Sequence, residues 1–167
     1  MYTPKVLKHF QHPKNYGKLK NPDGTGKVGN IVCGDVMWLY INVAKNNKNE
    51  EIIKNIKFET FGCVSAIATS SYITDLAKNK TITEALKISK DEIVNGLGGL
   101  PSIKIHCSVL AVDALSEAIY DHFIKTKQPI SDKLEQQHLR IVKDRDTIEH
   151  RYSDWTKKEE ELHNSSI

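Results

Sequence analysis

Charge of one sign, long apolar runs and cysteine are all scarce in this sequence. The 24 lysine and arginine residues are balanced by 21 aspartate and glutamate residues, which leaves a net charge of +3 over 167 residues. This balance excludes the basic surface that is typical of nucleic-acid-binding proteins. No segment is long and apolar enough to span a bilayer, and the N-terminal part has no signal-peptide core. We therefore expect a cytoplasmic protein with no nucleic-acid and no membrane partner.

The few cysteines are informative through their positions. Cys33, Cys63 and Cys107 lie far apart, and none of them forms the Cys-x-x-Cys spacing of zinc ribbons or ferredoxins. An odd number of distant cysteines in a reducing compartment also excludes a disulfide framework. Each cysteine lies beside a glycine or at a junction between predicted elements. This placement favours metal or sulfur chemistry, and an interaction module with buried cysteines is the alternative.

The length is sufficient for one domain with a substantial core and a tail. An apolar run at 36–43 and an alternating pattern at 52–60 predict a small antiparallel sheet within an α+β fold. Residues 13–30, rich in glycine and proline, are expected to form a long irregular loop. Helices are expected at residues 4–10 and 65–72, after the capping residues Thr81 and Ser89, and from about 107 to 123.

The composition changes near the end of the chain. We divide the sequence into a domain at 1–128 and a charged, mainly helical extension at 129–167, whose periodicity predicts one helix to about residue 150. His122, on the apolar face of the preceding helix, is expected to be a packing residue. Three histidines of the extension have no evident partner and are expected on the surface: His138, His150 and His163. The sequence leaves open whether the extension docks on the domain, pairs with a second copy or does neither.

Two further metal donors lie beside the cysteines. Asp35 follows Cys33 by two residues, and such residues of an extended chain share a face, so the thiol and the carboxylate can converge on one ion. His106 adds an imidazole next to Cys107, at a helix N-terminus whose positive end, with Lys104 nearby, favours a thiolate. Three thiols with one carboxylate and one imidazole can bind iron and sulfide, and would release a cluster more easily than four thiolates. Such a set suits cluster assembly and delivery.

Four ordered motifs carry a resemblance to a known family. They are residues 7–17 (LKHFQHPKNYG), 33–37 (CGDVM), 61–68 (FGCVSAIA) and 104–108 (KIHCS). From residue 2 to about 127 the sequence resembles the U-type iron–sulfur cluster assembly scaffolds, which are related to the N-terminal domain of nitrogen-fixation scaffold proteins. The resemblance implies a three-stranded antiparallel sheet with helices packed on one face and a metal site exposed at one end.

The resemblance also implies roles for matching residues. Cys33, Cys63 and Cys107 resemble the three cluster cysteines, and Asp35 and His106 resemble the positions that alternate as the fourth ligand. Cys107 further resembles the acceptor of persulfide sulfur from a cysteine desulfurase. The resemblance therefore implies a non-catalytic scaffold. It would build a [2Fe–2S] cluster, or a [4Fe–4S] cluster between two copies, from iron and sulfur. The cluster would then pass to apo iron–sulfur acceptor proteins.

Some details of the resemblance concern partners and alternatives. Lys104 resembles a residue that swings toward the metal, and Tyr2 matches an aromatic residue used in self-association, which implies a homodimer. In the family, an Hsp70-type chaperone recognises a segment that has a proline where this sequence has Ser102. The resemblance therefore does not imply this chaperone as a partner. The alternative function is a zinc-bound sulfur-transfer protein that accepts persulfide, with zinc in the same site. A hydrolase using Cys107 and His106 is disfavoured, because adjacent helical residues point about 100° apart.

Overall fold

The computed structural model of the chain describes residues 1–30 and 34–164, with side chains up to residue 150 and that of Ser153. One antiparallel sheet is formed in the order β1-β2-β3 by β1 (Gly24–Gly29), β2 (Val36–Lys45) and β3 (Glu51–Phe61). The turn between β2 and β3 is closed by Asn46, whose side-chain oxygen accepts hydrogen bonds from the amides of Lys48 and Glu50. The predicted α+β fold with a three-stranded sheet is confirmed.

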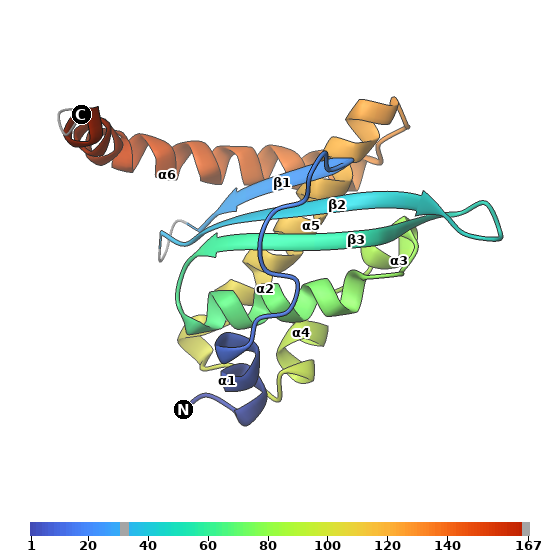
Figure 1. The fold of residues 1–167 in the computed structure, drawn as a ribbon, viewed down its shortest axis with the longest axis horizontal. Coiled ribbons are helices and arrows are strands. Elements are labelled where there is room, and N and C mark those ends of the chain that lie inside the picture. Colours follow the sequence, from blue (N-terminus) through green and yellow to red (C-terminus); the bar gives the residue numbers. More distant parts are fainter. Residues whose placement is uncertain (31–33, 165–167) are drawn as a thin grey trace.

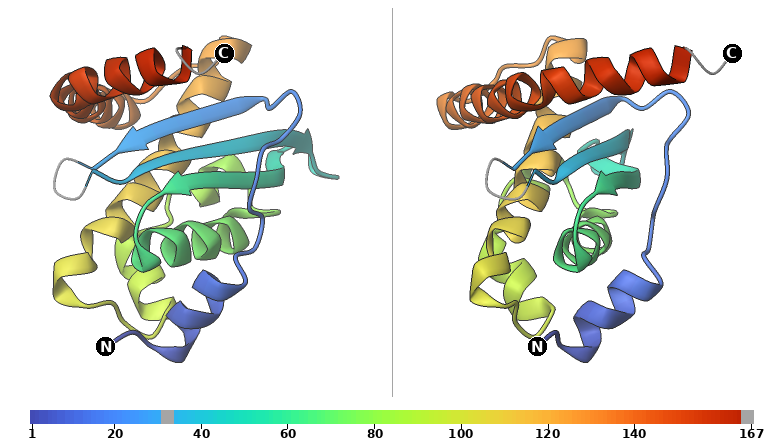
Figure 2. Two further views of the ribbon diagram at one scale, coloured as in Figure 1. Left: turned by 60° about the vertical axis from the view of Figure 1, so that its left-hand side comes forward. Right: turned by 90° about the vertical axis from the view of Figure 1, so that its left-hand side faces the viewer.

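Helices α2 (Val64–Ala77) and α5 (His106–Thr126) pack against the same face of the sheet, as Figures 1 and 2 show. The strand side chains that point to this face are fully buried, among them Met37, Leu39 and Phe58. The other helices are α1 (Pro4–Gln11), α3 (Ile82–Ala85), α4 (Lys90–Gly96) and α6 (Asp132–Asn164), and a 3-10 turn, η1 (Ser102–Lys104), precedes α5. In the part of the chain that the structure describes, no helix has the length and apolar character needed to cross a membrane.

Strand β1 is the main difference from the sequence prediction, which assigned residues 13–30 to an irregular loop. Its glycines serve close packing: a β-carbon on Gly24 or Gly26 would overlap backbone oxygens of α5. The facing residues of the helix are also small, Ala118 and Ala114 respectively. Because neither side presents a large side chain, the helix backbone lies directly on the strand. Glycines in a strand often mark such close backbone approach, and here they do not mark a turn.

The predicted short helices begin at side-chain caps. Thr3, Thr81 and Ser89 each accept a hydrogen bond from a backbone N–H in the first turn of the helix that follows. At Thr81 the capping box is complete, because the carboxylate of Glu84 accepts a hydrogen bond from the Thr81 backbone N–H. These caps confirm the predicted starts of α1, α3 and α4.

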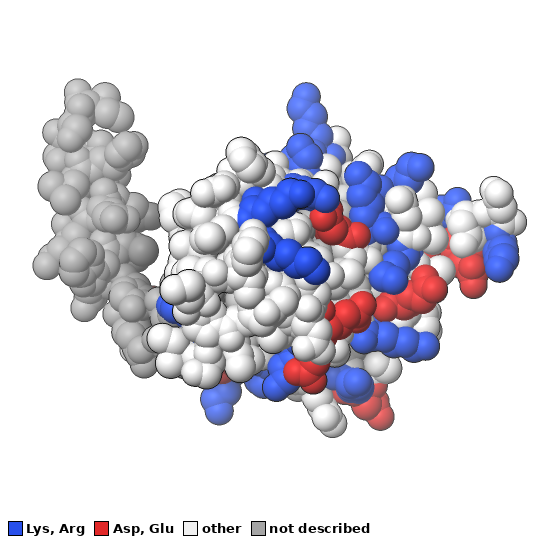
Figure 3. Space-filling view, turned by 90° about the horizontal axis from the view of Figure 1, so that it is seen from below, with Lys and Arg blue, Asp and Glu red and all other residues white. Residues whose placement is uncertain are grey.

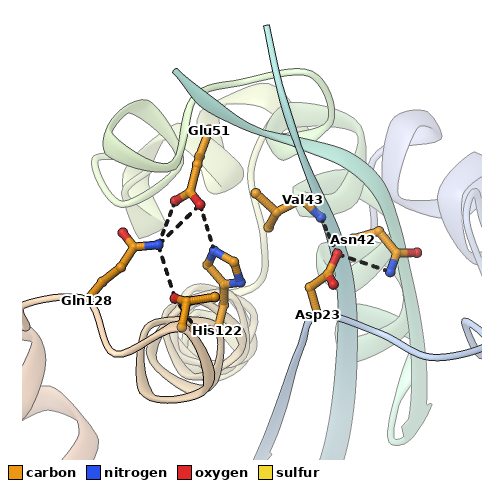
Figure 4. Close-up of polar contacts among 7 residues, drawn as sticks. Asp23, Asn42, Val43, Glu51, His122 and Gln128 are labelled. Carbon is orange, nitrogen blue, oxygen red and sulfur yellow. Dashed lines mark hydrogen bonds and ion pairs between the residues drawn. The ribbon is translucent and has the colours of Figure 1, made fainter. Parts of the chain in front are cut away.

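His122, expected to be a packing residue, is 4% exposed on α5. Its Nε2 lies 3.3 Å from Oε1 of Glu51 at the start of β3, and Gln128 donates to both oxygens of that carboxylate. Figure 4 shows this cluster together with Asp23, whose side chain accepts a hydrogen bond from the backbone N–H of Val43. The cluster ties the end of α5 to the start of β3, and His122 is buried as predicted, although its Nδ1 has no hydrogen-bond partner among the described residues.

Helix α6 extends past residue 150, where the sequence prediction ended it. It lies along β1 and contacts α5 (Figure 1). Leu134, Ile141 and Ile148 are seven residues apart, so they share one face of the helix, and all three are buried. In the structure the extension therefore docks on the domain of its own chain.

His138 corrects a second expectation, because it was predicted to lie on the surface without a partner. Its ring stacks on that of Tyr120 with centroids 3.8 Å apart, and its Nδ1 lies 2.8 Å from Oε1 of Glu117. Close by on α6, Arg140 donates to Oδ1 of Asp113 at 2.7 Å. Helix α5 thus buries two carboxylates that are paired with side chains of α6.

Candidate metal centre

Chain segments that are distant in sequence meet at one end of the sheet. The register pairs Val36 with Phe61, so Asp35 and Gly62 lie side by side where β2 begins and β3 ends. Cys63 follows directly as the N-cap residue of α2. The first two residues of α5 are His106 and Cys107, and they reach the same place because α5 packs against both α2 and the sheet.

The donor atoms of these residues are close to one another. Sγ of Cys107 lies 3.8 Å from Sγ of Cys63 and 4.0 Å from Oδ2 of Asp35. One donor atom from each of Asp35, His106 and Cys107 lies within 4.8 Å of the other two. The distance between the sulfurs is far longer than the roughly 2 Å of a disulfide bond, so the two cysteines are not joined by one.

Burial of these donors fits a metal ligand set. Cys107 is fully buried and Asp35 is 7% exposed, whereas Cys63 and His106 are partly exposed. Nε2 of His106 is buried and has no hydrogen-bond partner among the described residues. A buried ring nitrogen without a partner is costly unless another group or an ion binds it. The imidazole is thus suited to accept a metal ion as its partner.

Lys104 lies in η1, immediately before α5. The negative charge of the Cys63 thiolate, followed by that of Cys107, raises the pKa of Lys104. The ammonium group of Lys104 therefore lies close enough to the two sulfurs to interact with them electrostatically.

Cys33, the third predicted cysteine ligand, lies outside the described residues. The residues on either side of that segment are placed: the amide of Gly34 donates to the carbonyl of Asn30, and the amide of Asn30 donates to the carbonyl of Asp35, at 2.8 and 2.9 Å. The two described residues that flank this segment, Asn30 and Gly34, thus lie next to Asp35. The assignment of Cys33 as a ligand stays a prediction.

The structure adds residues that the sequence analysis did not assign to the site. A β-carbon on Gly62 would lie 3.1 Å from Cγ of Asp35, so this glycine leaves room for the carboxylate. Thr69 on α2 donates from Oγ1 to the carbonyl of Cys107 at 3.1 Å, which joins the two helices that carry the thiols. The sequence signal for Gly62 was its place before Cys63. Thr69 gave no signal, because its partner lies 38 residues away.

Apolar side chains are exposed around this end of the molecule. Phe61, Ile103 and Ile105 are 78%, 76% and 38% exposed. Figure 3 views the molecule from the side of α1 and α4, and uncharged residues cover much of the half nearest this end. Exposed apolar groups beside a buried donor set are typical of a surface that meets other proteins.

Taken together, the fold and the donor set define an α+β protein with a candidate metal centre at one end of its sheet. Residues 1–129 match the family model of the NifU-like N-terminal domain. The chain is 57% identical over 125 residues to the iron–sulfur cluster assembly scaffold protein IscU 1 of Archaeoglobus fulgidus, covering 75% of this chain and 78% of that protein. The IscU scaffold protein of Aquifex aeolicus is 44% identical over 124 residues, 74% of this chain and 77% of that protein.

A solved structure agrees with the fold. The N-terminal part of a NifU-like protein from Brucella abortus superposes with a TM-score of 0.55 at 18% identity, covering 74% of this chain and 94% of that one. The chain belongs to the U-type iron–sulfur cluster assembly scaffold family, whose shared unit is the NifU-like N-terminal domain. The resemblance stated from the four motifs is thereby confirmed.

Proposed function

We propose that this chain is a non-catalytic scaffold on which a [2Fe–2S] cluster is assembled and from which it is transferred to apo-proteins. The observation that carries the proposal is the close approach of two thiols, a carboxylate and an imidazole, supplied by Cys63, Cys107, Asp35 and His106. Relatives that are named as iron–sulfur cluster assembly scaffold proteins support it. Cys33 completes the ligand set as a prediction from the sequence.

The proposed ligand set explains why a cluster would be held and later released. Thiolates bind iron and sulfide strongly, whereas a carboxylate or an imidazole is a harder and weaker ligand for a cluster. Asp35 and His106 each present a donor atom within 4.8 Å of the other's donor atom and of the Cys107 sulfur, so either can complete the set. Exchange between them would open one position on the iron without loss of the cluster.

Sulfur would come from a cysteine desulfurase. The thiolate of the scaffold attacks the terminal sulfur of the desulfurase persulfide, a new S–S bond forms, and the desulfurase cysteine leaves as a thiolate. Cys107 is fully buried, so its use as the acceptor requires a local rearrangement that exposes its sulfur, whereas Cys63, with its sulfur 3.8 Å away, is partly exposed. The exposed side chains of Phe61 and Ile103 are suited to dock the desulfurase and the acceptor proteins.

The test is anaerobic reconstitution with a cysteine desulfurase, cysteine, ferrous iron and a dithiol that reduces persulfide sulfur to sulfide. We expect visible sulfur-to-iron absorption, equal amounts of iron and sulfide, and transfer of the cluster to an apo-ferredoxin. Cys63→Ser and Cys107→Ser are expected to lose the cluster, and Asp35→Ala to change its retention. Asp91→Ala, on the exposed surface of α4, is the matched control. If both serine variants reconstitute as well as the parent, the proposal is wrong.

The other predictions about function have less support. No observation favours the zinc-bound sulfur-transfer alternative, because the relatives above are named as cluster assembly scaffolds. The homodimer, the movement of Lys104 toward the metal and the cytoplasmic location stay predictions. So does the division of the chain at residue 128.

A further inference from the structure

We propose that α6 is a positioning element for Asp35, acting through Ile148 on the end of β1. Helix α6 lies outside residues 1–129, which the family model covers, so this role is a property of the extension. The inference rests on the proposed function, in which Asp35 is a candidate ligand. Its test includes a measurement that needs no metal, so the two proposals can fail separately.

The contact between α6 and the site passes through the last residue of β1. A β-carbon built on Gly29 would lie 2.7 Å from Cδ1 of Ile148 and 3.8 Å from the backbone oxygen of Asp35. The amide of the next residue, Asn30, donates to that same oxygen at 2.9 Å. Ile148, only 7% exposed, therefore covers the strand at the point where the strand holds the backbone of Asp35.

The side chain of Asp35 projects into the candidate metal centre. Its Oδ2 lies 4.0 Å from Sγ of Cys107, and its Cγ would be 3.1 Å from a β-carbon on Gly62. The backbone of this residue is thus held from the side of β1, while its carboxylate faces the thiols. A shift at the end of β1 would move the carboxylate relative to Cys107, and ligand distances tolerate only about 0.2 Å.

Polar pairs fix α6 in the register that brings Ile148 to Gly29. On α5, Asp113 and Glu117 are 7% and 6% exposed, and their side chains pair with Arg140, His138 and Gln137 of α6. Burial raises the pKa of Glu117, and the hydrogen bond with His138 opposes that rise.

One residue beyond Ile148, the carboxylate of Glu149 forms an ion pair of 2.6 Å with Lys27 of β1. Buried carboxylates on α5 are costly without partners. The sequence of α5 is thus adapted to a docked α6, and the ion pair with Lys27 extends the docking to the strand. These contacts keep the isoleucine over the end of β1.

The first test measures anaerobic Co²⁺ binding to the full chain by its absorption spectrum. Ile148→Ala is expected to weaken Co²⁺ binding about tenfold, as loss of support behind a metal ligand commonly does. Leu134→Ala removes a side chain of similar size from the same buried face of α6, about 20 Å along the helix, and is expected to leave Co²⁺ affinity unchanged. Ile148→Val is expected to restore most of the affinity.

Two further measurements separate positioning from general destabilisation. In an Asp35→Ala background, Ile148→Ala is expected to have no further effect on Co²⁺ affinity, because the effect passes through Asp35. Without metal, amide hydrogen exchange of Asn30 is expected to be faster in Ile148→Ala than in Leu134→Ala. Equal Co²⁺ affinities of the two alanine variants, additive effects with Asp35→Ala, or unchanged exchange of Asn30 would each overturn the proposal.

Discussion

The contact between β1 and α5 predicts that one methyl group at Gly26 has a large effect on stability. A β-carbon at this position would lie 2.7 Å from the backbone nitrogen of Ala118 and 2.9 Å from Cβ of Glu117, and would overlap the backbone oxygen of Ala114. Most of these atoms belong to the helix backbone, which cannot rotate away. Gly26→Ala must therefore separate the helix from the strand.

The magnitude follows from opposing contributions. Overpacking of a core contact costs about 1–3 kcal/mol, and the upper end applies here because backbone atoms are met. Moving the helix and the strand about 0.5–1 Å apart also removes a quarter to a half of the van der Waals attraction between the atoms packed there. The substitution also stabilises the protein by about 0.4–1 kcal/mol, because alanine restricts the unfolded chain more than glycine does. We expect a net loss of about 2 kcal/mol from a total stability of about 5–15 kcal/mol.

The assay is urea unfolding of Gly26→Ala beside Gly29→Ala, the same substitution in the same strand. On Gly29 the β-carbon would also meet an atom at 2.7 Å, but that atom is the terminal Cδ1 of Ile148, which can rotate. Gly29→Ala is therefore expected to stay within about 1 kcal/mol of the parent. Equal free energies of unfolding for the two variants would refute the reasoning.

Three further predictions concern the site, the open face of the sheet and α6. A β-carbon on Gly62 would lie 2.7 Å from Cβ of Ala66 and 3.1 Å from Cγ of Asp35, so Gly62→Ala is expected to shift both the start of α2 and the carboxylate and to weaken anaerobic Co²⁺ binding about tenfold, and an unchanged titration would contradict this. Burial, then the hydrogen bond to Glu59, raises the pKa of Tyr40 to about 12, so the part of the tyrosinate absorbance that Tyr40→Phe removes should appear near that pH, and earlier in Glu59→Gln. The unfolded chain loses this proton first, near its ordinary pKa of 10.0, so stability should fall from there toward about 12. Arg140→Met leaves a buried carboxylate without its ion pair and should cost about 1–3 kcal/mol in urea unfolding, unlike an exposed substitution.

The sequence was sufficient to predict the helices and strands that are specified by residues close to one another in the chain. Caps at Thr3, Thr81 and Ser89 specify helix starts within four residues, and alternation specifies β3 along its own length. Strand β1 has no such signal, since Gly24 and Gly26 have meaning only beside the small residues of α5. Periodicity within one segment cannot show which distant helix will cover it.

The same reasoning explains what was predicted of the candidate site. Cys63 and Cys107 were recognised because glycine and helix starts lie next to them in sequence, yet the 3.8 Å between their sulfurs depends on how α2 and α5 pack. His138 was misread for the converse reason: its partners Tyr120 and Glu117 lie 18 and 21 residues earlier, on another helix. A motif therefore identifies a donor, whereas the distance between donors is set by packing. This is why a side chain as remote as that of Ile148, without chemistry of its own, can decide where a ligand lies.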